Sequence, residues 1–342
     1  MEPGLVIIYL VVVIGLVFEF LNGFHDAANA IATVVATRVL RPGVAVAMAG
    51  GLNLLGALSG TAVAVTLGSG IVEPTAVTQT TVLVALIGAA LWDVVTWYYG
   101  LPTSSSHALI FSLIGAAVAQ RGFKVIVLMG TIKTGIGIVY SPLIGLTFAA
   151  GIMLALYWLF HRTRAATVSG LFGKLQLVSS AYMAFSHGGN DGQKTMGVIT
   201  LALFSAGLLG KTFYVPFWVI VACALSMGLG TAFGGWRIID TMGHRLVAKL
   251  VPVNGFAAET AAGTVIEIAT RLGVPISTTH AVSGAILGVG LIRGPRSVGW
   301  QVAGNIVTAW ALTIPVCFAM GYLFMRLLVE LVHLGVAIPG VG

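Results

Sequence analysis

The chain has 342 residues, of which 58% are hydrophobic and only 8% are charged. Soluble domains are about a quarter charged, so this composition excludes an ordinary soluble protein and predicts an all-α integral membrane protein with many bilayer crossings. The formal net charge is +7. Excess Lys and Arg in cytoplasmic loops is how membrane proteins set their orientation, so the charge gives no reason to expect nucleic acid as a partner.

The first half predicts five membrane crossings and one re-entrant hairpin. A continuous helix over residues 5–40 would be longer than a ~30 Å hydrocarbon core needs, so we expect an interruption near residues 22–26. Residues 102–120 are short, polar at one end and preceded by Pro, which indicates the re-entrant hairpin. The crossings are predicted at 5–40, 44–68, 80–99, 125–140 and 142–160.

The second half repeats this order after a basic linker at 161–174. Because five is an odd number, the halves 1–160 and 175–342 must insert as inverted repeats, with broken helices at the midplane, as in secondary transporters. Placing the linker in the cytoplasm puts most Lys and Arg inside and both termini outside. The crossings are predicted at 175–209 (also interrupted), 215–233, 254–272, 298–312 and 313–334, with a hairpin at 275–290 and a basic loop at 237–249.

A polar motif with a central Asp occurs once in each half. Residues 22–29 read NGFHDAAN and residues 187–194 read HGGNDGQK, which places Asp26 and Asp191 165 positions apart. A carboxylate at the bilayer centre costs several kcal/mol, so we expect both to serve a function, namely cation coupling. A helix cap, or an ion pair of Asp26 with Lys194, is the structural alternative. His25 is a candidate for proton involvement, and Gln193 and Lys194 are candidates for substrate binding.

Two hydroxyl-rich tips form a second repeated motif. Residues 103–107 read TSSSH and residues 276–280 read ISTTH, offset by 173 positions. A helix that begins just after each run directs free N–H groups and the positive end of its dipole toward the hydroxyls, which makes an anion site. One hydroxyl of each run is also expected to cap its helix. The predicted substrate-binding hydroxyls are those of Ser104, Ser105, Ser106, Ser277, Thr278 and Thr279.

The two kinds of motif together predict cation-coupled anion transport. Hydroxyls and helix N-termini suit a tetrahedral oxyanion, and carboxylates suit a small cation. Carboxylates beside an anion repel it unless a cation or proton lies between them. This reasoning leaves phosphate and sulfate open as substrates. His107 and His280, which follow the hydroxyl runs, either hold the tips by hydrogen bonds or carry protons.

At these motifs the chain resembles the inorganic phosphate transporter (PiT) family. The Gly-Ala-Asn-Asp type signature of that family matches residues 188–191, and it matches residues 23–26 with His25 in place of Asn. The Pro-x-Ser-x-x-His hairpin motif matches in both halves. The resemblance implies phosphate import driven by Na⁺ or H⁺. Besides the two Asp residues and the hydroxyl tips, it implicates Asn29 in substrate binding and Asn190 in cation coupling.

The His-Asp form of the first signature resembles the bacterial low-affinity branch of this family, whose members are similar to proton-coupled carriers of metal–phosphate complexes. The resemblance therefore favours H⁺ over Na⁺ and leaves free and metal-complexed phosphate open. No cofactor is expected, and no metal ligands are assigned. The protein is expected in the cell membrane, with a homo-oligomer as one open state.

Three other functions compete with cation-coupled phosphate import. A sulfate permease of the same fold would use the same groups. A passive anion channel would need no coupling ion. An intramembrane hydrolase is disfavoured because Ser106 and His107 are adjacent in the sequence and neither HExxH nor GxSxG occurs. We therefore expect a transporter and not an enzyme.

Overall fold

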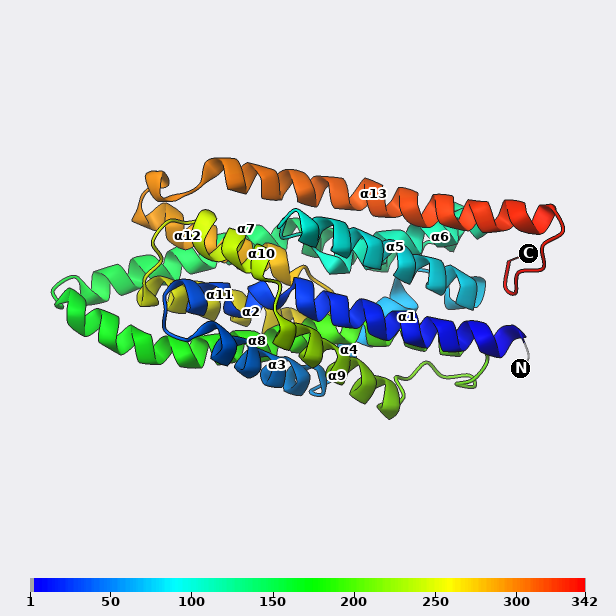
Figure 1. Cartoon of the computed structure of the whole chain (residues 1–342), viewed down its shortest axis with the longest axis horizontal. Helices are drawn as coiled ribbons and strands as arrows, with labels where there is room; N and C mark the ends of the chain where they lie inside the picture. The colour runs from blue at the N-terminus through cyan, green and yellow to red at the C-terminus, as the bar shows by residue number, and fades with distance from the viewer. Residues whose placement is uncertain (1–2, 342) are drawn as a thin grey trace.

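The computed structural model describes residues 3–341 and consists of helices that lie along one long axis (Figure 1). No β-strand forms within residues 3–341, where only two isolated bridges occur, Val72 with Ile126 and Val247 with Val298. The all-α prediction is confirmed. The helices are α1 Pro3–His25, α2 Ala27–Ala36, α3 Pro42–Ala57, α4 Ala62–Gly70, η1 Pro74–Ala76, α5 Gln79–Tyr98, α6 Ser105–Arg121, η2 Phe123–Val125, α7 Leu128–Phe160, α8 Ala165–Ser205, α9 Phe217–Phe233, α10 Trp236–Asp240, η3 Thr241–Arg245, α11 Pro252–Arg271, α12 Thr278–Arg293, η4 Pro295–Ser297 and α13 Trp300–His333.

Several of these helices are long and apolar enough to cross a membrane. Four spans within the described residues meet that description, one of them formed by α1 and α2 together, and up to six do if each of two bent pairs forms one span. The pair α3–α4 bends by 66°, and α9 bends by 62° against Trp236–Arg245. The long helices also expose large apolar side chains, as lipid contact requires. Examples are Leu143 and Leu154 on α7 and Leu323 and Leu327 on α13.

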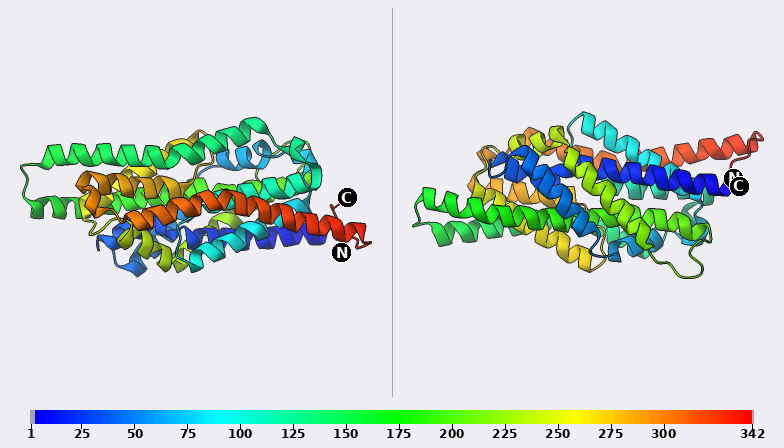
Figure 2. Two further views of the ribbon diagram at one scale, coloured as in Figure 1. Left: turned by 90° about the horizontal axis from the view of Figure 1, so that it is seen from above. Right: turned by 60° about the horizontal axis from the view of Figure 1, so that its bottom comes forward.

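The order of elements in the first half recurs in the second half. Each half has a bent helix pair, a 20-residue helix (α5, α11), a helix entered through a polar tip (α6, α12) and a helix of 33 or 34 residues (α7, α13). The colours of Figure 2 show α7 and α13 running in opposite directions. Both chain ends lie at the end of the molecule opposite the turn at 161–164 (Figure 1). Two inverted repeats would produce this arrangement, and the boundaries 1–160 and 175–342 remain a prediction.

The four crossings predicted at 125–140, 142–160, 298–312 and 313–334 are in fact two helices. Pro142 lies inside α7 and Pro315 lies inside α13, and neither proline ends its helix. The reason is tertiary packing, since α7 packs along α12 and α13 packs along α6. Neighbouring helices make proline tolerable inside a membrane helix. The predicted division of each region into two crossings is therefore wrong.

The predicted interruption of the second half at residues 187–194 is also wrong, because α8 runs unbroken from Ala165 to Ser205. The linker predicted at 161–174 shrinks to 161–164 for the same reason. In the first half the interruption is confined to Asp26, between α1 and α2. The pronounced bends lie elsewhere, between α3 and α4 and between α9 and α10. Part of the predicted basic loop 237–249 is accordingly helical.

Glycines of the two Asp motifs allow helices to cross closely. A Cβ on Gly188 would lie 2.1 Å from the carbonyl oxygen of Asn53 on α3, and one on Gly23 would lie 2.3 Å from that of Met227 on α9. A side chain at either position would overlap backbone atoms of the neighbouring helix. The sequence motif therefore marks close packing around the two Asp residues more than a break in the helix.

The predicted hairpin tips lead directly into helices. An extended segment precedes α6 and another precedes α12, each beginning at a glycine with positive φ, Gly100 (65°) and Gly273 (64°). The rings of His107 and His280, in the first turns of these helices, are 4.7 Å apart. The N-termini of α6 and α12 therefore meet inside the molecule, and the two helices lead away toward opposite ends (Figure 1).

Candidate functional site

The candidate residues named from the sequence are all buried. None of the thirteen side chains is more than 5% exposed. They come from the α1–α2 junction, the middle of α8, and the tips that precede α6 and α12. The site is therefore a closed polar region surrounded by apolar helices.

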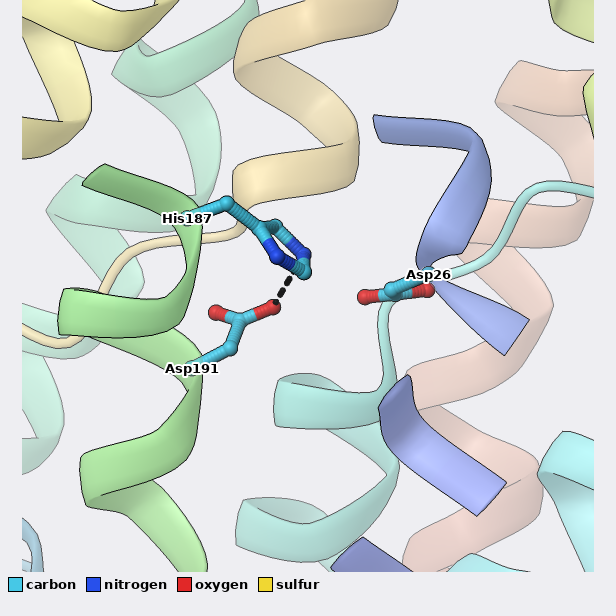
Figure 3. A group of neighbouring side chains, drawn as sticks. All are labelled: Asp26, His187 and Asp191. Atoms are coloured by element: carbon cyan, nitrogen blue, oxygen red, sulfur yellow. Dashed lines mark ion pairs between the residues drawn. The ribbon is translucent and has the colours of Figure 1, made fainter. Parts of the chain in front are cut away.

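Three titratable side chains form a compact cluster at the centre of this region. Asp26 lies at the α1–α2 junction, and His187 and Asp191 lie one turn apart on α8 (Figure 3). One ligand atom from each lies within 4.8 Å of the others, a spacing at which they could hold a metal ion. Asp26 and Asp191, which are 165 positions apart in the sequence, therefore lie close together in the fold.

The hydrogen bonds of Asn53 determine which nitrogen of His187 carries a proton. The Asn53 amide donates to Thr231 Oγ1 at 2.8 Å, so its oxygen is left to accept from His187 Nδ1 at 3.2 Å. His187 Nε2 then lies 3.2 Å from Asp191 Oδ2. Two states make this contact favourable. Either Nε2 carries a proton that it donates to the carboxylate, or Nε2 has a lone pair and a cation lies between it and the carboxylate. Either way, the cluster accommodates positive charge.

The contact between His25 and Asp26 also contains a proton. Thr96 donates its hydroxyl proton to the Trp92 carbonyl at 2.9 Å, so it accepts from His25 Nε2 at 3.1 Å. His25 Nδ1 lies 2.7 Å from Asp26 Oδ1. At that distance one of the two atoms must be protonated. The pair is therefore an imidazolium beside a carboxylate or a neutral imidazole beside a carboxylic acid.

Lys194 neutralises Asp191 rather than Asp26. Its ammonium donates to Asp191 Oδ1, to Ser106 Oγ and to the carbonyl of Ile276, the last at 2.7 Å. These three bonds use all three protons of the ammonium group. Lys194 therefore pairs with Asp191, one turn away on α8, and not with Asp26. The same ammonium group contacts both hydroxyl tips.

The hydroxyl tips cap their helices, as expected. Ser104 and Ser277 cap α6 and α12 by accepting from the backbone N–H groups of His107 and His280, at 3.3 and 3.1 Å. The hydroxyls of Ser106, Thr278 and Thr279 bond to the charged cluster. One serine or threonine of each run is therefore committed to capping, which leaves two hydroxyls per tip for a ligand.

The second tip is bonded to both Asp residues. Thr278 donates to Asp191 Oδ2 at 2.7 Å, and Thr279 donates to Asp26 Oδ2 at 3.3 Å. The Asn29 amide donates to both threonine hydroxyls, at 3.3 and 3.0 Å. Asn29 and the threonines thus connect the two carboxylates through neutral hydrogen bonds.

Two candidate residues lie at the edge of this group. The Gln193 amide accepts from the backbone N–H of Val63 at 2.8 Å and donates to the carbonyl of Gly189 at 2.7 Å. It satisfies the free N-terminal N–H groups of α4 at the α3–α4 bend, so its polar atoms are used on backbone. The Asn190 amide donates to Thr270 Oγ1 at 2.9 Å. Neither side chain bonds to the other candidate residues within the described chain.

Sequence reasoning assigned no role to several residues that the structure places around the site. Asn53 fixes a proton on Nδ1 of His187, and Thr96 fixes one on Nε2 of His25. Asp93 is buried in α5 beside the first tip. The available signal was a polar side chain inside an otherwise apolar crossing, which gives no information on its partner. The cluster of Asp26, His187 and Asp191 likewise required the fold.

A helical membrane protein with a closed, charged and hydroxyl-rich centre has the architecture of a membrane transporter. A family model described as the phosphate transporter family matches residues 22–321, so the chain belongs to that family. The predicted resemblance is confirmed.

The sequence similarity to known relatives extends over nearly the whole chain. A protein of Rhizobium meliloti (strain 1021), named a probable low-affinity inorganic phosphate transporter, is 51% identical over 89% of this chain and 91% of its own length. A protein of Bacillus subtilis (strain 168) with the same name is 40% identical over 94% of this chain and 97% of its own length. A solved structure named "The sodium-dependent phosphate transporter" is similar with a TM-score of 0.87 at 25% identity, over 96% of this chain and all of that one. The prediction of a transporter that is not an enzyme is confirmed.

Proposed function

We propose that this protein is a secondary active importer of inorganic phosphate in the cell membrane, driven by a coupled cation. The observation that carries the proposal is the direct contact between two buried carboxylates, Asp26 and Asp191, and the hydroxyl tip that precedes α12. The names of the relatives and of the similar structure support phosphate as the substrate.

The proposed phosphate site lies between the N-termini of α6 and α12. Each helix start offers free N–H groups and the positive end of a dipole, and the tips add hydroxyl donors. The ligands are Ser105, Ser106, Thr278, Thr279 and Asn29, with Lys194 as the one cationic donor. Ser104 and Ser277 hold the helix starts in place as caps, and Gln193 positions the α3–α4 bend.

An exchange of partners explains how a cation could promote phosphate binding. Lys194, Thr278 and Thr279 currently direct their protons to the two carboxylates. A cation or proton that binds the carboxylates would release these donors for an anion. The same cation would also remove the repulsion between the carboxylates and phosphate. Phosphate and cation would therefore bind better together than alone, which is the requirement for coupled transport.

The hydrogen bonds favour a proton as the coupling ion. The His25–Asp26 contact already contains a proton, and His25 is the side-chain type that titrates near neutral pH. The similar solved structure is named as a sodium-dependent protein, so Na⁺ remains the alternative. Asn190, next to Asp191, is retained as a proposed coupling residue.

Phosphate could also enter as a complex with a divalent metal. One imidazole nitrogen and two carboxylates are a ligand set that transition metals accept, and Asp26, His187 and Asp191 supply one. In that case the metal would be cargo released with phosphate. Uptake of free phosphate in chelator-treated medium separates this case from transport of phosphate alone.

The test of the proposed function is uptake of radiolabelled phosphate by proteoliposomes. With an imposed proton gradient, acid outside, we expect phosphate to accumulate above its external concentration. Accumulation would exclude a passive channel, and an excess of unlabelled sulfate should not compete. If sulfate is concentrated instead, the sulfate permease is the correct assignment. If no anion accumulates under any imposed cation gradient, the proposal is wrong.

A further inference from the structure

Asp93 is a buried carboxyl group that none of the interactions above accounts for. It lies on α5, is 1% exposed, and neither of its carboxyl oxygens has a hydrogen-bond partner among residues 3–341. An ionised carboxylate without a partner in such a place is very costly. A bound proton, or a cation, removes that cost.

A second free polar group lies beside Asp93. The hydroxyl of Ser105, which is also 1% exposed, lies close enough to interact with the Asp93 carboxyl, although no hydrogen bond of standard geometry joins them or gives Ser105 another partner within the described chain. Ser105 is the first residue of α6, so its hydroxyl lies at the helix N-terminus of the proposed phosphate site. Asp93 therefore lies directly behind one of the substrate-binding groups.

The equivalent position in the second half carries no charge. The 173-residue offset of the two tips aligns Asp93 with Ile266 on α11 and Ser105 with Thr278 on α12. Thr278 donates to Asp191 and has no acidic residue at the aligned position. Asp93 is therefore a feature of one half only, and the shared architecture of the halves does not require it.

The surroundings of Asp93 contain little compensating positive charge. The titratable groups that face it are His25 and Asp26 at the end of α1, Asp191 on α8 and the thiol of Cys317 on α13. The proton in the His25–Asp26 contact already serves Asp26, and Lys194 serves Asp191. An oxyanion that arrives at Ser105 would therefore meet an uncompensated carboxylate if Asp93 were ionised.

We propose that Asp93 and Ser105 form a proton-binding site in which a protonated Asp93 is the condition for phosphate to bind at the start of α6. The neutral acid removes the repulsion and can donate its proton to the Ser105 oxygen, which turns the hydroxyl proton of Ser105 toward the anion. The inference rests on the proposed phosphate site, and it adds one proton that enters and leaves together with the substrate.

Phosphate binding to the purified full-length protein in detergent tests this inference, measured by calorimetry between pH 5.5 and 8. A requirement for one proton makes the dissociation constant rise by about tenfold per pH unit once Asp93 ionises, beyond the change caused by ionisation of phosphate itself. Asp93→Asn mimics the neutral acid. We expect this variant to bind phosphate at low pH as tightly as the wild type does, and its dissociation constant to lack the additional rise with pH.

The control is Glu73→Gln, which removes an exposed carboxylate from the loop before η1 and should leave the profile unchanged. Asp93→Glu keeps a titratable carboxyl group, so its dissociation constant should still show the additional rise with pH. If Asp93→Asn is unstable, Asp93→Ser removes the same group. If the dissociation constant of the Asn or Ser variant rises with pH as steeply as that of the wild type, the inference is wrong and the proposed function is unaffected. The same holds if a folded variant does not bind phosphate at low pH. If the wild-type protein binds no phosphate at any pH, the proposed function fails as well.

Discussion

Asp26 and Asp191 differ in how their negative charge is compensated. Asp191 is compensated by a buried ammonium group on the same helix, whereas Asp26 depends on the proton that it shares with His25. A buried ion pair is strongly destabilised when only one partner is removed, because the other charge remains uncompensated. Variants of the two Asp residues therefore need different controls.

We expect Asp191→Asn to reduce coupled phosphate uptake by at least roughly 100-fold, since loss of one partner of a buried charge pair costs about 3 kcal/mol or more. The measurement is gradient-driven uptake in proteoliposomes. Because the single variant leaves Lys194 uncompensated, Asp191→Asn combined with Lys194→Gln serves as the control for folding, followed by size-exclusion chromatography. Near-normal uptake by either folded variant would remove Asp191 from the coupling site.

His25→Asn tests the proposed identity of the coupling ion. The variant removes the imidazole that shares a proton with Asp26, so Asp26 becomes an ordinary carboxylate that can hold Na⁺. We expect uptake to lose much of its dependence on pH and to gain dependence on Na⁺. The measurement is initial uptake across a range of pH, with and without Na⁺. His161→Asn, in the exposed turn before α8, is the matched control. An unchanged pH and Na⁺ profile would exclude His25 from coupling.

Much of the candidate site could be predicted from single residues, because carboxylates and hydroxyl runs are conspicuous in an apolar sequence. The motifs identified Asp26, Asp191 and both tips. They could not show that Lys194 reaches Ser106 and the carbonyl of Ile276, since these contacts join segments more than 80 positions apart. The same limit hid the role of Asp93, whose neighbours depend on how α5 packs against α1 and α6.

At the scale of helices, glycine determines how closely α8 approaches its neighbours. Gly188 meets the backbone of Asn53 on α3, and Gly197 meets that of Ala64 on α4, where a Cβ would lie 2.4 Å from the carbonyl oxygen. Small residues at helix interfaces are what allow such crossings in membranes. The positions of His187 and Asp191 opposite Asp26 depend on this close packing.

Gly188→Ala should therefore destabilise the protein, by about 1–3 kcal/mol, as is typical of overpacking. The added methyl group would force α3 away from α8 at the level of the charged cluster. Thermal unfolding in detergent measures the effect. Gly170→Ala, on the same helix with no atom within 4 Å of the added carbon, should be neutral or slightly stabilising. Equal stability of the two variants would contradict the packing explanation.

Helix boundaries could be predicted where polar residues or turns mark them. The predicted crossings at 80–99 and 254–272 agree closely with α5 and α11. Prediction failed where packing overrides a local signal, as at Pro142, which α7 accommodates. The bend between α3 and α4 carries only weak local signals and is held by Gln193 from a distant helix, so it could not be located from the sequence.

At the scale of the whole molecule, the two halves place both termini opposite the turn at 161–164 (Figure 1). The distribution of Lys and Arg predicts that this turn is cytoplasmic and that both termini are outside. A single cysteine introduced at Thr163 should react with an impermeant thiol reagent only from the cytoplasmic side, and one at Ala337 only from outside. Native Cys223 and Cys317 are buried and should give little background. The opposite labelling pattern would reverse the proposed orientation.

Cation-coupled accumulation of phosphate is the central claim, and it is proposed from the meeting of Asp26, Asp191 and both hydroxyl tips. The most direct test is the phosphate concentration inside proteoliposomes after separate proton and sodium gradients are imposed, with no gradient as reference. We predict accumulation above the external concentration with the proton gradient, and its loss in Asp191→Asn combined with Lys194→Gln. Equilibration to equal concentrations under every gradient would contradict the account.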